Sequence, residues 1–390
     1  MNLKLIAFVP LAALLIGSQS CGDAGGNSTT SQGTEDTPKQ LVAAASNYAD
    51  IVLASYEDSY QTAVVLRDAI NHFVDHPSEE QFLDCKNKWL QARIPYGQTE
   101  AYRFYGGPID DKDGPEGLIN AWPMDENFID YVEGMPEVGL INDPASYPTI
   151  DKALLSDLNE KASEESIFTG YHAIEFLLWG QDLSASSAGQ RPYTDYLTTG
   201  GTAKNQERRG LYLKTVADLL VDHLGEVKEE WKADGAYRTS FLGRPNADLI
   251  NNIFGALSKL SKGELSGERM FVAVDSKDQE NEHSCFADNT IADIQQNFQG
   301  LVNVYTGSYS RTNGTVVSGQ SYRDIAAALN APKAKAVDAA IATARSKINT
   351  IPSPFDQAIL NNSEVVLEAV TALEDLSDAF ADVAVDLGAQ

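Results

Sequence analysis

Apolar side chains recur every three or four residues along most of the chain beyond residue 40, which is the spacing of one face of an α-helix. The clearest stripes are Leu41 to Phe73, Leu213 to Trp231, Leu249 to Leu260, Ile291 to Tyr305, Val337 to Ile348 and Val366 to Leu387. Strict alternation of apolar and polar residues, typical of half-buried strands, is confined to short loop stretches. The sequence therefore predicts an all-α fold.

The length of the chain favours two domains. Its 390 residues exceed the roughly 250–300 at which a single core usually divides. The longest break between helical stripes falls at residues 232–246, which predicts two helical bundles, 41–235 and 236–390. Three stretches rich in turn-forming residues are predicted to be long loops, which are usually functional or mobile. These are residues 106–148, 182–210 and 305–322.

The first forty residues indicate export. Lys4 precedes an apolar run from Leu5 to Ile16, which is too short to span a bilayer but typical of a signal peptide. Small and polar residues then lead to Cys21, so residues 1–20 are predicted to be a lipoprotein signal peptide and Cys21 the lipid-bearing residue; ordinary secretion is the alternative. Residues 21–40 are predicted to be a flexible tether. We expect anchoring in the bacterial envelope, at the outer membrane, on its periplasmic or cell-surface face.

The net charge limits the possible ligands, and the cysteine content limits the possible disulfides. Lys and Arg number 29 against 56 Asp and Glu, and this net charge of −27 excludes nucleic acid and favours cations. In an oxidising compartment Cys85 and Cys285 can form a disulfide or remain two buried thiols, and the sequence leaves both open.

The most specific candidate site is Gly170-Tyr-His172-Ala-Ile-Glu175. His172 and Glu175 are three residues apart on a predicted helix, so both project from one face and can bind a divalent metal. The same spacing is common in hydrogen-bonded pairs that hold no metal. A zinc hydrolase needs three protein ligands, and Phe176 stands where the His-x-x-Glu-His signature has its second histidine, so the evidence for proteolysis is weak.

The remaining histidines and tryptophans have a structural interpretation beside any functional one. His283 and Asp288 lie in an acidic stretch that is either a second cation site or a solvated helix start. His72 and His76 are predicted at a surface helix end and His223 on a helix surface. Trp179 and Trp231 are predicted in the core.

Several blocks in order resemble the imelysin (M75) family, of the iron-regulated lipoprotein type. They are Trp89 to Phe104, Gly107-Pro-Ile-Asp110, Gly114-Pro-Glu116, Asn120-Ala-Trp122-Pro, the Gly-x-His-x-x-Glu motif, Gly255 to Met270, and Glu282 to Thr290. One difference is Ile291, where iron-regulated members often have a histidine.

The resemblance implies an exported or lipid-anchored protein of two helical bundles that is associated with iron uptake. It makes His172 and Glu175 the leading metal ligands and Glu100 a third, which Arg93 would orient. His283 and Asp288 would lie behind these ligands or form a second site. We expect binding of iron, with zinc as the other candidate metal, rather than catalysis. The alternatives are an M75-type metallopeptidase and a metal-free surface protein that engages a haem or iron-carrier protein. The expected partners are a metal ion or iron carrier and envelope iron-uptake proteins.

Overall fold

The computed structural model describes residues 33–184 and 186–390. The predicted signal peptide, Cys21 and the first part of the predicted tether lie outside these residues. Helix α1 (Gly33–Asp75) begins before the predicted tether ends, so residues 33–40 are helical instead. No helix in the described ranges is long and apolar enough to cross a membrane.

The all-α prediction is confirmed, and every predicted stripe lies on a helix. The longer helices are α1, α2 (Glu79–Thr99), α5 (Gly170–Trp179), α6 (Gln206–Glu230), α8 (Asn246–Ser258), α10 (Thr290–Thr306), α12 (Ala331–Ile348) and α14 (Ser363–Leu387). The shorter ones are η1 (Glu100–Tyr102), α3 (Glu116–Ile119), η2 (Glu126–Phe128), η3 (Leu140–Asn142), α4 (Lys152–Leu158), η4 (Tyr193–Tyr196), α7 (Ala236–Leu242), α9 (Val272–Ser276), η6 (Gln279–Asn281), η7 (Cys285–Ala287), α11 (Tyr322–Leu329) and α13 (Phe355–Asn361).

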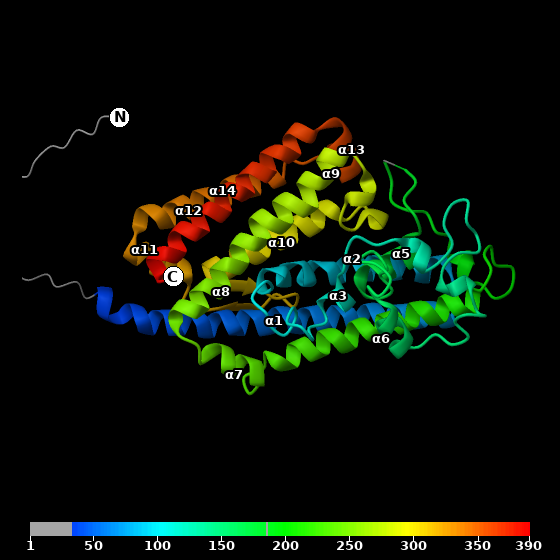
Figure 1. The fold of residues 1–390 in the computed structure, drawn as a ribbon, viewed down its shortest axis with the longest axis horizontal. Coiled ribbons are helices and arrows are strands. Elements are labelled where there is room, and N and C mark those ends of the chain that lie inside the picture. Colours follow the sequence, from blue (N-terminus) through cyan, green and yellow to red (C-terminus); the bar gives the residue numbers. More distant parts are fainter. Residues whose placement is uncertain (1–32, 185) are drawn as a thin grey trace, which may run out of the picture.

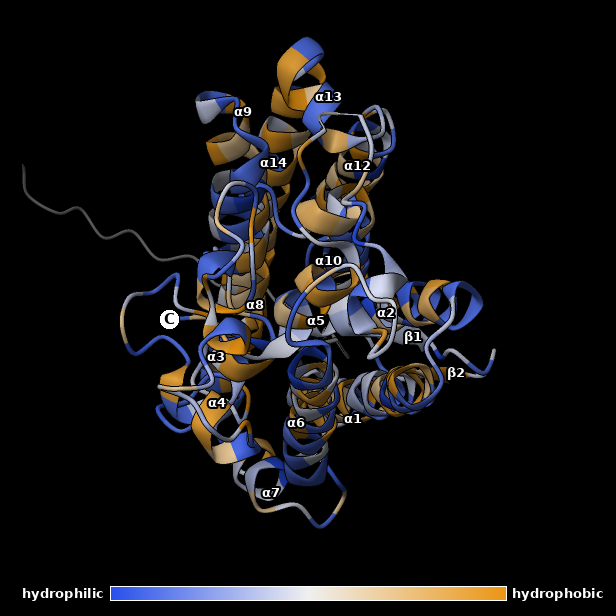
Figure 2. Cartoon of the chain, turned by 90° about the vertical axis from the view of Figure 1, so that its right-hand side faces the viewer, coloured by the Kyte–Doolittle hydropathy of each residue, from blue (hydrophilic) through white to orange (hydrophobic). Residues whose placement is uncertain are grey.

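The long helices form two groups, and the second lies over the first and is inclined to α1 and α2 (Figure 1). One group contains α1, α2, α5 and α6, and the other contains α8, α10, α12 and α14. Figure 2, seen along the long axis, places α5 and α10 near the middle, between α6 below and α12 and α14 above. The residues around α5 therefore lie where the two groups meet.

Two local features depart from the predicted loops and helices. Residues 305–322 contain a small antiparallel hairpin, β1 (Ser308–Ser310) and β2 (Val316–Ser318), in which Tyr309 faces Val317. Helix α8 continues without a break into η5 (Lys259–Phe271), a π-helical stretch, and then α9. Such widened turns often occur at functional sites.

The buried apolar residues form one continuous cluster that includes residues of both helix groups. The predicted core residues Trp179 and Trp231 belong to it. Helix α7, which follows the predicted boundary at residue 235, packs on α1 and α6 of the first group. The division into two domains stays a prediction, because the core alone does not separate them.

Cys85 and Cys285 are both buried free thiols, so the disulfide alternative is not realised. Cys85 lies in α2 and Cys285 in η7. Burial raises the pKa of Cys85 to about 12, which keeps this thiol protonated and unreactive near neutral pH.

A buried ion-pair network fixes the loops of the first helix group. Asp130 accepts two hydrogen bonds from Arg209, at 2.7 and 2.9 Å, and one from Arg191 at 2.6 Å. The three side chains are at most 1% exposed. Because Arg209 belongs to α6 and Asp130 follows η2, the network joins the 126–131 loop to the main bundle.

Candidate functional site

Helix α5 presents the Gly-x-His-x-x-Glu motif in a fully buried position. Gly170 has φ +83°, and a Cβ there would lie 2.4 Å from the carbonyl oxygen of Ile119. The preceding Thr169 hydroxyl donates to the carbonyl of Leu118 at 3.0 Å. Glycine thus allows the start of α5 to contact the backbone of residues 118–119 closely, and His172 lies beside the ring of Trp122.

We expect Gly170→Ala to destabilise the protein by about 2–4 kcal/mol, because the added Cβ meets a backbone oxygen and the residue must keep a positive φ. Denaturant unfolding measures the change. Gly134→Ala is the matched control, since its φ is +75° but nothing lies within 4 Å of its added Cβ. An equal loss in both variants would show that the contact with Ile119 contributes nothing.

Two histidines distant in sequence meet at the centre of the molecule. The Nε2 atoms of His172 and His283 lie 3.2 Å apart. Both side chains are buried, and the ring of Trp122 covers them, with ring centroids 4.8 Å from His172 and 6.1 Å from His283. The site is therefore formed by both helix groups rather than by α5 alone.

Each histidine is oriented by a carboxylate on its other ring nitrogen. His172 Nδ1 lies 2.8 Å from Glu175 Oε2, and Glu175 Oε1 accepts from the backbone N–H of Ala287 at 2.9 Å. His283 Nδ1 lies 3.2 Å from Asp293 Oδ2. A carboxylate behind each imidazole is the usual arrangement around metal-binding histidines.

Asp293 also links α10 to α2. Arg93 donates to its two carboxylate oxygens at 2.9 and 3.2 Å, and both side chains are 2% exposed. Arg93 also donates to Asn120 Oδ1 at 2.5 Å. Burial would raise the pKa of Asp293, but Arg93 and His283 hold it well below its usual range, so this residue is anionic.

The hydrogen bonds among the four side chains define where their protons lie. Burial lowers the pKa of both histidines, that of His283 to about 4, so both rings are neutral near pH 7. His283 then carries its proton on Nδ1, facing the anionic Asp293, and its Nε2 is an acceptor. His172 must donate from Nε2 and accept at Nδ1 from a protonated Glu175. Burial raises the pKa of Glu175, which favours this protonated form.

The two Nε2 atoms also fit a shared metal ion. Two imidazole nitrogens on one tetrahedral zinc ion, at about 2.0–2.1 Å each, are roughly 3.3 Å apart. The observed separation of 3.2 Å is close to this value. Metal binding requires both Nε2 atoms to be unprotonated. His172 would then carry its proton on Nδ1, facing an ionised Glu175, and the pair would release one proton.

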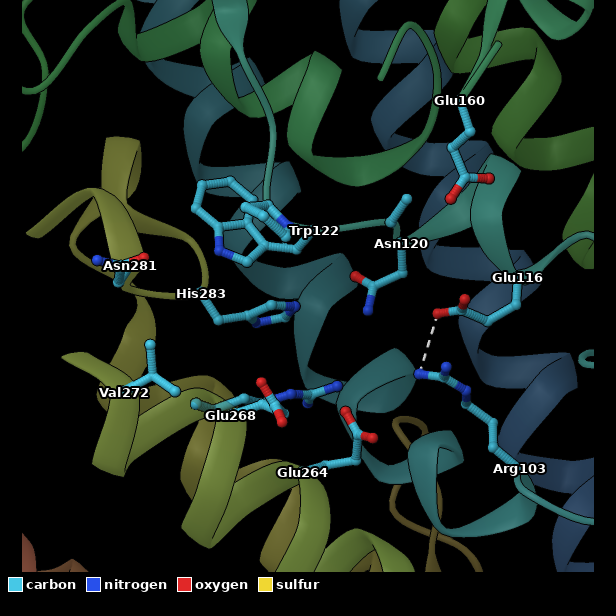
Figure 3. A pocket seen from close by; sticks show the side chains of 13 residues that line it. Arg103, Glu116, Asn120, Trp122, Glu160, Glu264, Glu268, Val272, Asn281 and His283 are labelled. Atoms are coloured by element: carbon cyan, nitrogen blue, oxygen red, sulfur yellow. Dashed lines mark ion pairs between the residues drawn. The ribbon is translucent and has the colours of Figure 1, made fainter. Parts of the chain in front are cut away.

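A cavity of about 290 Å³ adjoins His283 (Figure 3). Its lining includes Asn120 and Trp122 on one side and Glu264 and Glu268, from the π-helical stretch, on the opposite side. The other charged residues around it are Arg103, Glu116, Glu160 and Arg269. The cavity is rich in oxygen donors and carries more carboxylates than guanidinium groups.

The predicted site residues fall into three places. His172, Glu175 and His283 meet as described. Glu175, predicted as a metal ligand beside His172, contacts the Nδ1 atom of that histidine. The predicted Arg93–Glu100 pairing is wrong, because Arg93 pairs with Asp293. Asp288 lies with Asp182 and Asp356 rather than beside His283.

Glu100 lies in a separate ion cluster. Its Oε2 accepts from Arg269 at 2.6 Å and from Arg103 at 2.8 Å, and the side chain is buried. Against the effect of burial, these two guanidinium groups lower the pKa of Glu100 to about 2. Arg103 and Arg269, not Arg93, therefore orient Glu100, and this ion cluster links η1 to η5. The role of Glu100 as a metal ligand stays a prediction.

The other histidines have the structural roles predicted for them. His72 and His76 are exposed at the end of α1, and His223 is half-buried on α6 beside Glu226. Asp293 was missed by the sequence analysis. Its signal was its position on the apolar stripe of α10, one residue before Ile294, where a carboxylate needs a buried partner.

Comparison with known proteins supports the resemblance seen in the sequence. The imelysin (Peptidase M75) family model matches residues 52–381. Iron-regulated protein A of Synechococcus elongatus is 23% identical over 331 residues, which are 84% of this chain and 81% of that protein.

Two solved structures share the fold. One is described as an iron-regulated protein A precursor from Parabacteroides distasonis; it has a TM-score of 0.69 and 18% identity and covers 90% of this chain and 95% of its own. The other, an imelysin-like protein from Psychrobacter arcticum, has a TM-score of 0.59 and 13% identity over 88% of this chain and 93% of its own.

Proposed function

Because the chain belongs to the imelysin family, we propose that it is an exported metal-binding protein of bacterial iron acquisition, anchored to the envelope through Cys21. His172 and His283 hold the ion through their Nε2 atoms. The name of the cyanobacterial relative, iron-regulated protein A, supports the association with iron.

The observation that carries this proposal is the convergence of two Nε2 atoms, each on a ring whose Nδ1 faces a buried carboxylate. A pair of histidines that served packing alone would not need a carboxylate behind each ring. Glu175 fixes His172 and Asp293 fixes His283, so each ring is held with Nε2 toward the other.

The cavity beside His283 supports a mixed nitrogen and oxygen ligand set. Glu264 and Glu268 line it and offer carboxylate oxygens, and imidazole with carboxylate suits iron and zinc. A metal bound here would link α5 of the first helix group to the segment before α10 of the second. The acidic surface of the chain raises the local concentration of cations.

The test is the metal content of protein isolated from iron-replete cells, together with titration of the metal-free protein with Fe²⁺ and Zn²⁺. The wild type is expected to bind one ion per chain, and the double variant His172→Ala, His283→Ala none. The matched control is His72→Ala, His76→Ala, which removes two exposed histidines and leaves binding unchanged.

Equal metal content in the wild type and the His172, His283 double variant would contradict the proposal and favour a metal-free interaction protein. A peptide-cleavage assay on the zinc-loaded protein distinguishes the metallopeptidase. Turnover that is lost in Glu175→Gln would favour that enzyme over a binding protein.

A further inference from the structure

A second cluster of titratable groups lies apart from the histidine pair. Ligand oxygens of Asp182, Asp288 and Asp356 all lie within 4.8 Å of one another. Asp182 follows the end of α5, Asp288 follows η7, and Asp356 is in the first turn of α13. Three separate segments of the chain therefore bring carboxylates to one point.

The innermost of these carboxylates has no partner of its own. Asp356 is 1% exposed, and neither of its carboxylate oxygens has a hydrogen-bond partner among the described residues. Glu282, also 1% exposed, has an unpartnered Oε1, and Asp356 is the main charge that acts on it. Buried carboxylate oxygens without donors are costly unless a proton neutralises them or a cation binds them.

Mutual repulsion is evident in the same groups. Burial, together with the charge of Asp356, raises the pKa of Asp288 to about 7 and that of Asp182 to about 6. No Lys or Arg side chain is paired with any of the three within the described ranges. In the absence of a cation this cluster opposes folding.

We propose that Asp182, Asp288 and Asp356 bind a calcium ion. The three side chains offer only oxygen, which suits hard divalent cations rather than iron or zinc in a histidine site. Calcium accepts irregular ligand sets from loops at about 2.3–2.6 Å, so oxygens on opposite sides of the ion are roughly 4.6–5.2 Å apart. Asp288 is only half-buried, which leaves room for water ligands and a path of entry.

Calcium at this point would fasten the turn that follows His283. Asp288 adjoins Ala287, whose N–H donates to Glu175, and Asp182 follows the helix that contains His172. The ion would join these segments to α13. The site itself does not depend on metal binding by the two histidines, because it shares no ligand with them.

The experiment uses the full mature chain and Ca²⁺ alone. Equilibrium dialysis with radioactive calcium at up to about 10 mM, above the range of weak extracellular sites, is expected to give one ion per chain. Thermal unfolding is expected to shift upward by a few degrees with calcium. Asp356→Asn is expected to lose both responses and, without calcium, to unfold at a higher temperature than the wild type, because repulsion is relieved.

Asp375→Asn is the matched control, since it removes an exposed carboxylate of α14 and should retain calcium binding. Asp182→Asn is a second variant in case Asp356→Asn does not fold. Failure of the wild type to bind calcium, retention of the ion by both cluster variants, or an equal response to Mg²⁺ would overturn the assignment.

Discussion

His283→Ala is expected to abolish metal binding as completely as His172→Ala, whereas Glu175→Gln is expected to weaken it only about 10–100-fold. The reason is that the two histidines face each other through Nε2, while Glu175 contacts His172 through Nδ1. The short motif alone suggests the opposite order, with Glu175 as a ligand and His283 as an accessory residue. Titration of each metal-free variant with Fe²⁺ and Zn²⁺ measures the three affinities.

The appropriate control is Glu282→Gln, which changes a buried carboxylate next to His283 that hydrogen-bonds to Thr290 rather than to a histidine. Its affinity for iron and zinc should equal that of the wild type. If Glu175→Gln lost the ion entirely and His283→Ala retained it, the ligand set would be His172 with Glu175, and the pairing of histidines would have no part in binding.

The helices were predictable because their apolar period reports directly on burial. Each stripe named from the sequence lies on a helix of the structure, but the chain does not leave the first helix group at residue 235, because α7 still packs on α1 and α6. The π-helical stretch was not predictable, because Leu257, Leu260 and Leu265 fit an ordinary helix about as well.

The site was predictable only in part, because its members come from distant segments. The motif identified His172, but its partner His283 is 111 residues away and contacts it through a turn whose path no local pattern specifies. For Glu175 the sequence could not choose between a ligand position beside His172 and a hydrogen bond to it, because three-residue spacing permits both, and the structure shows the hydrogen bond. Asp182 and Asp356 gave no signal, since isolated acidic residues are usually solvated.

Asp293→Asn is expected to lower the free energy of unfolding by about 3–5 kcal/mol and also to weaken metal binding about 10–100-fold. The substitution leaves Arg93 buried without its counter-ion, because its ion pair is with this carboxylate and its other hydrogen bond is to the neutral Asn120. It also removes the negative charge that keeps the proton of His283 on Nδ1. Urea unfolding and metal titration of the same sample measure the two effects separately.

Asp130→Asn is the matched comparison, because Asp130 is equally buried and is paired with Arg191 and Arg209 but contacts neither histidine. We expect a similar loss of about 3–5 kcal/mol with unchanged metal affinity. Burial would raise the pKa of Asp130, but the two arginines lower it. The ionised carboxylate therefore contributes fully to the free energy of unfolding above about pH 4, the ordinary pKa of an unfolded aspartate. This contribution is lost as the pH falls below that value. Stability of the variant should therefore fall less steeply in acid than that of the wild type. If Asp130→Asn weakened metal binding as much as Asp293→Asn, the loss would reflect general loosening of the fold, and the specific role of Asp293 behind His283 would be refuted.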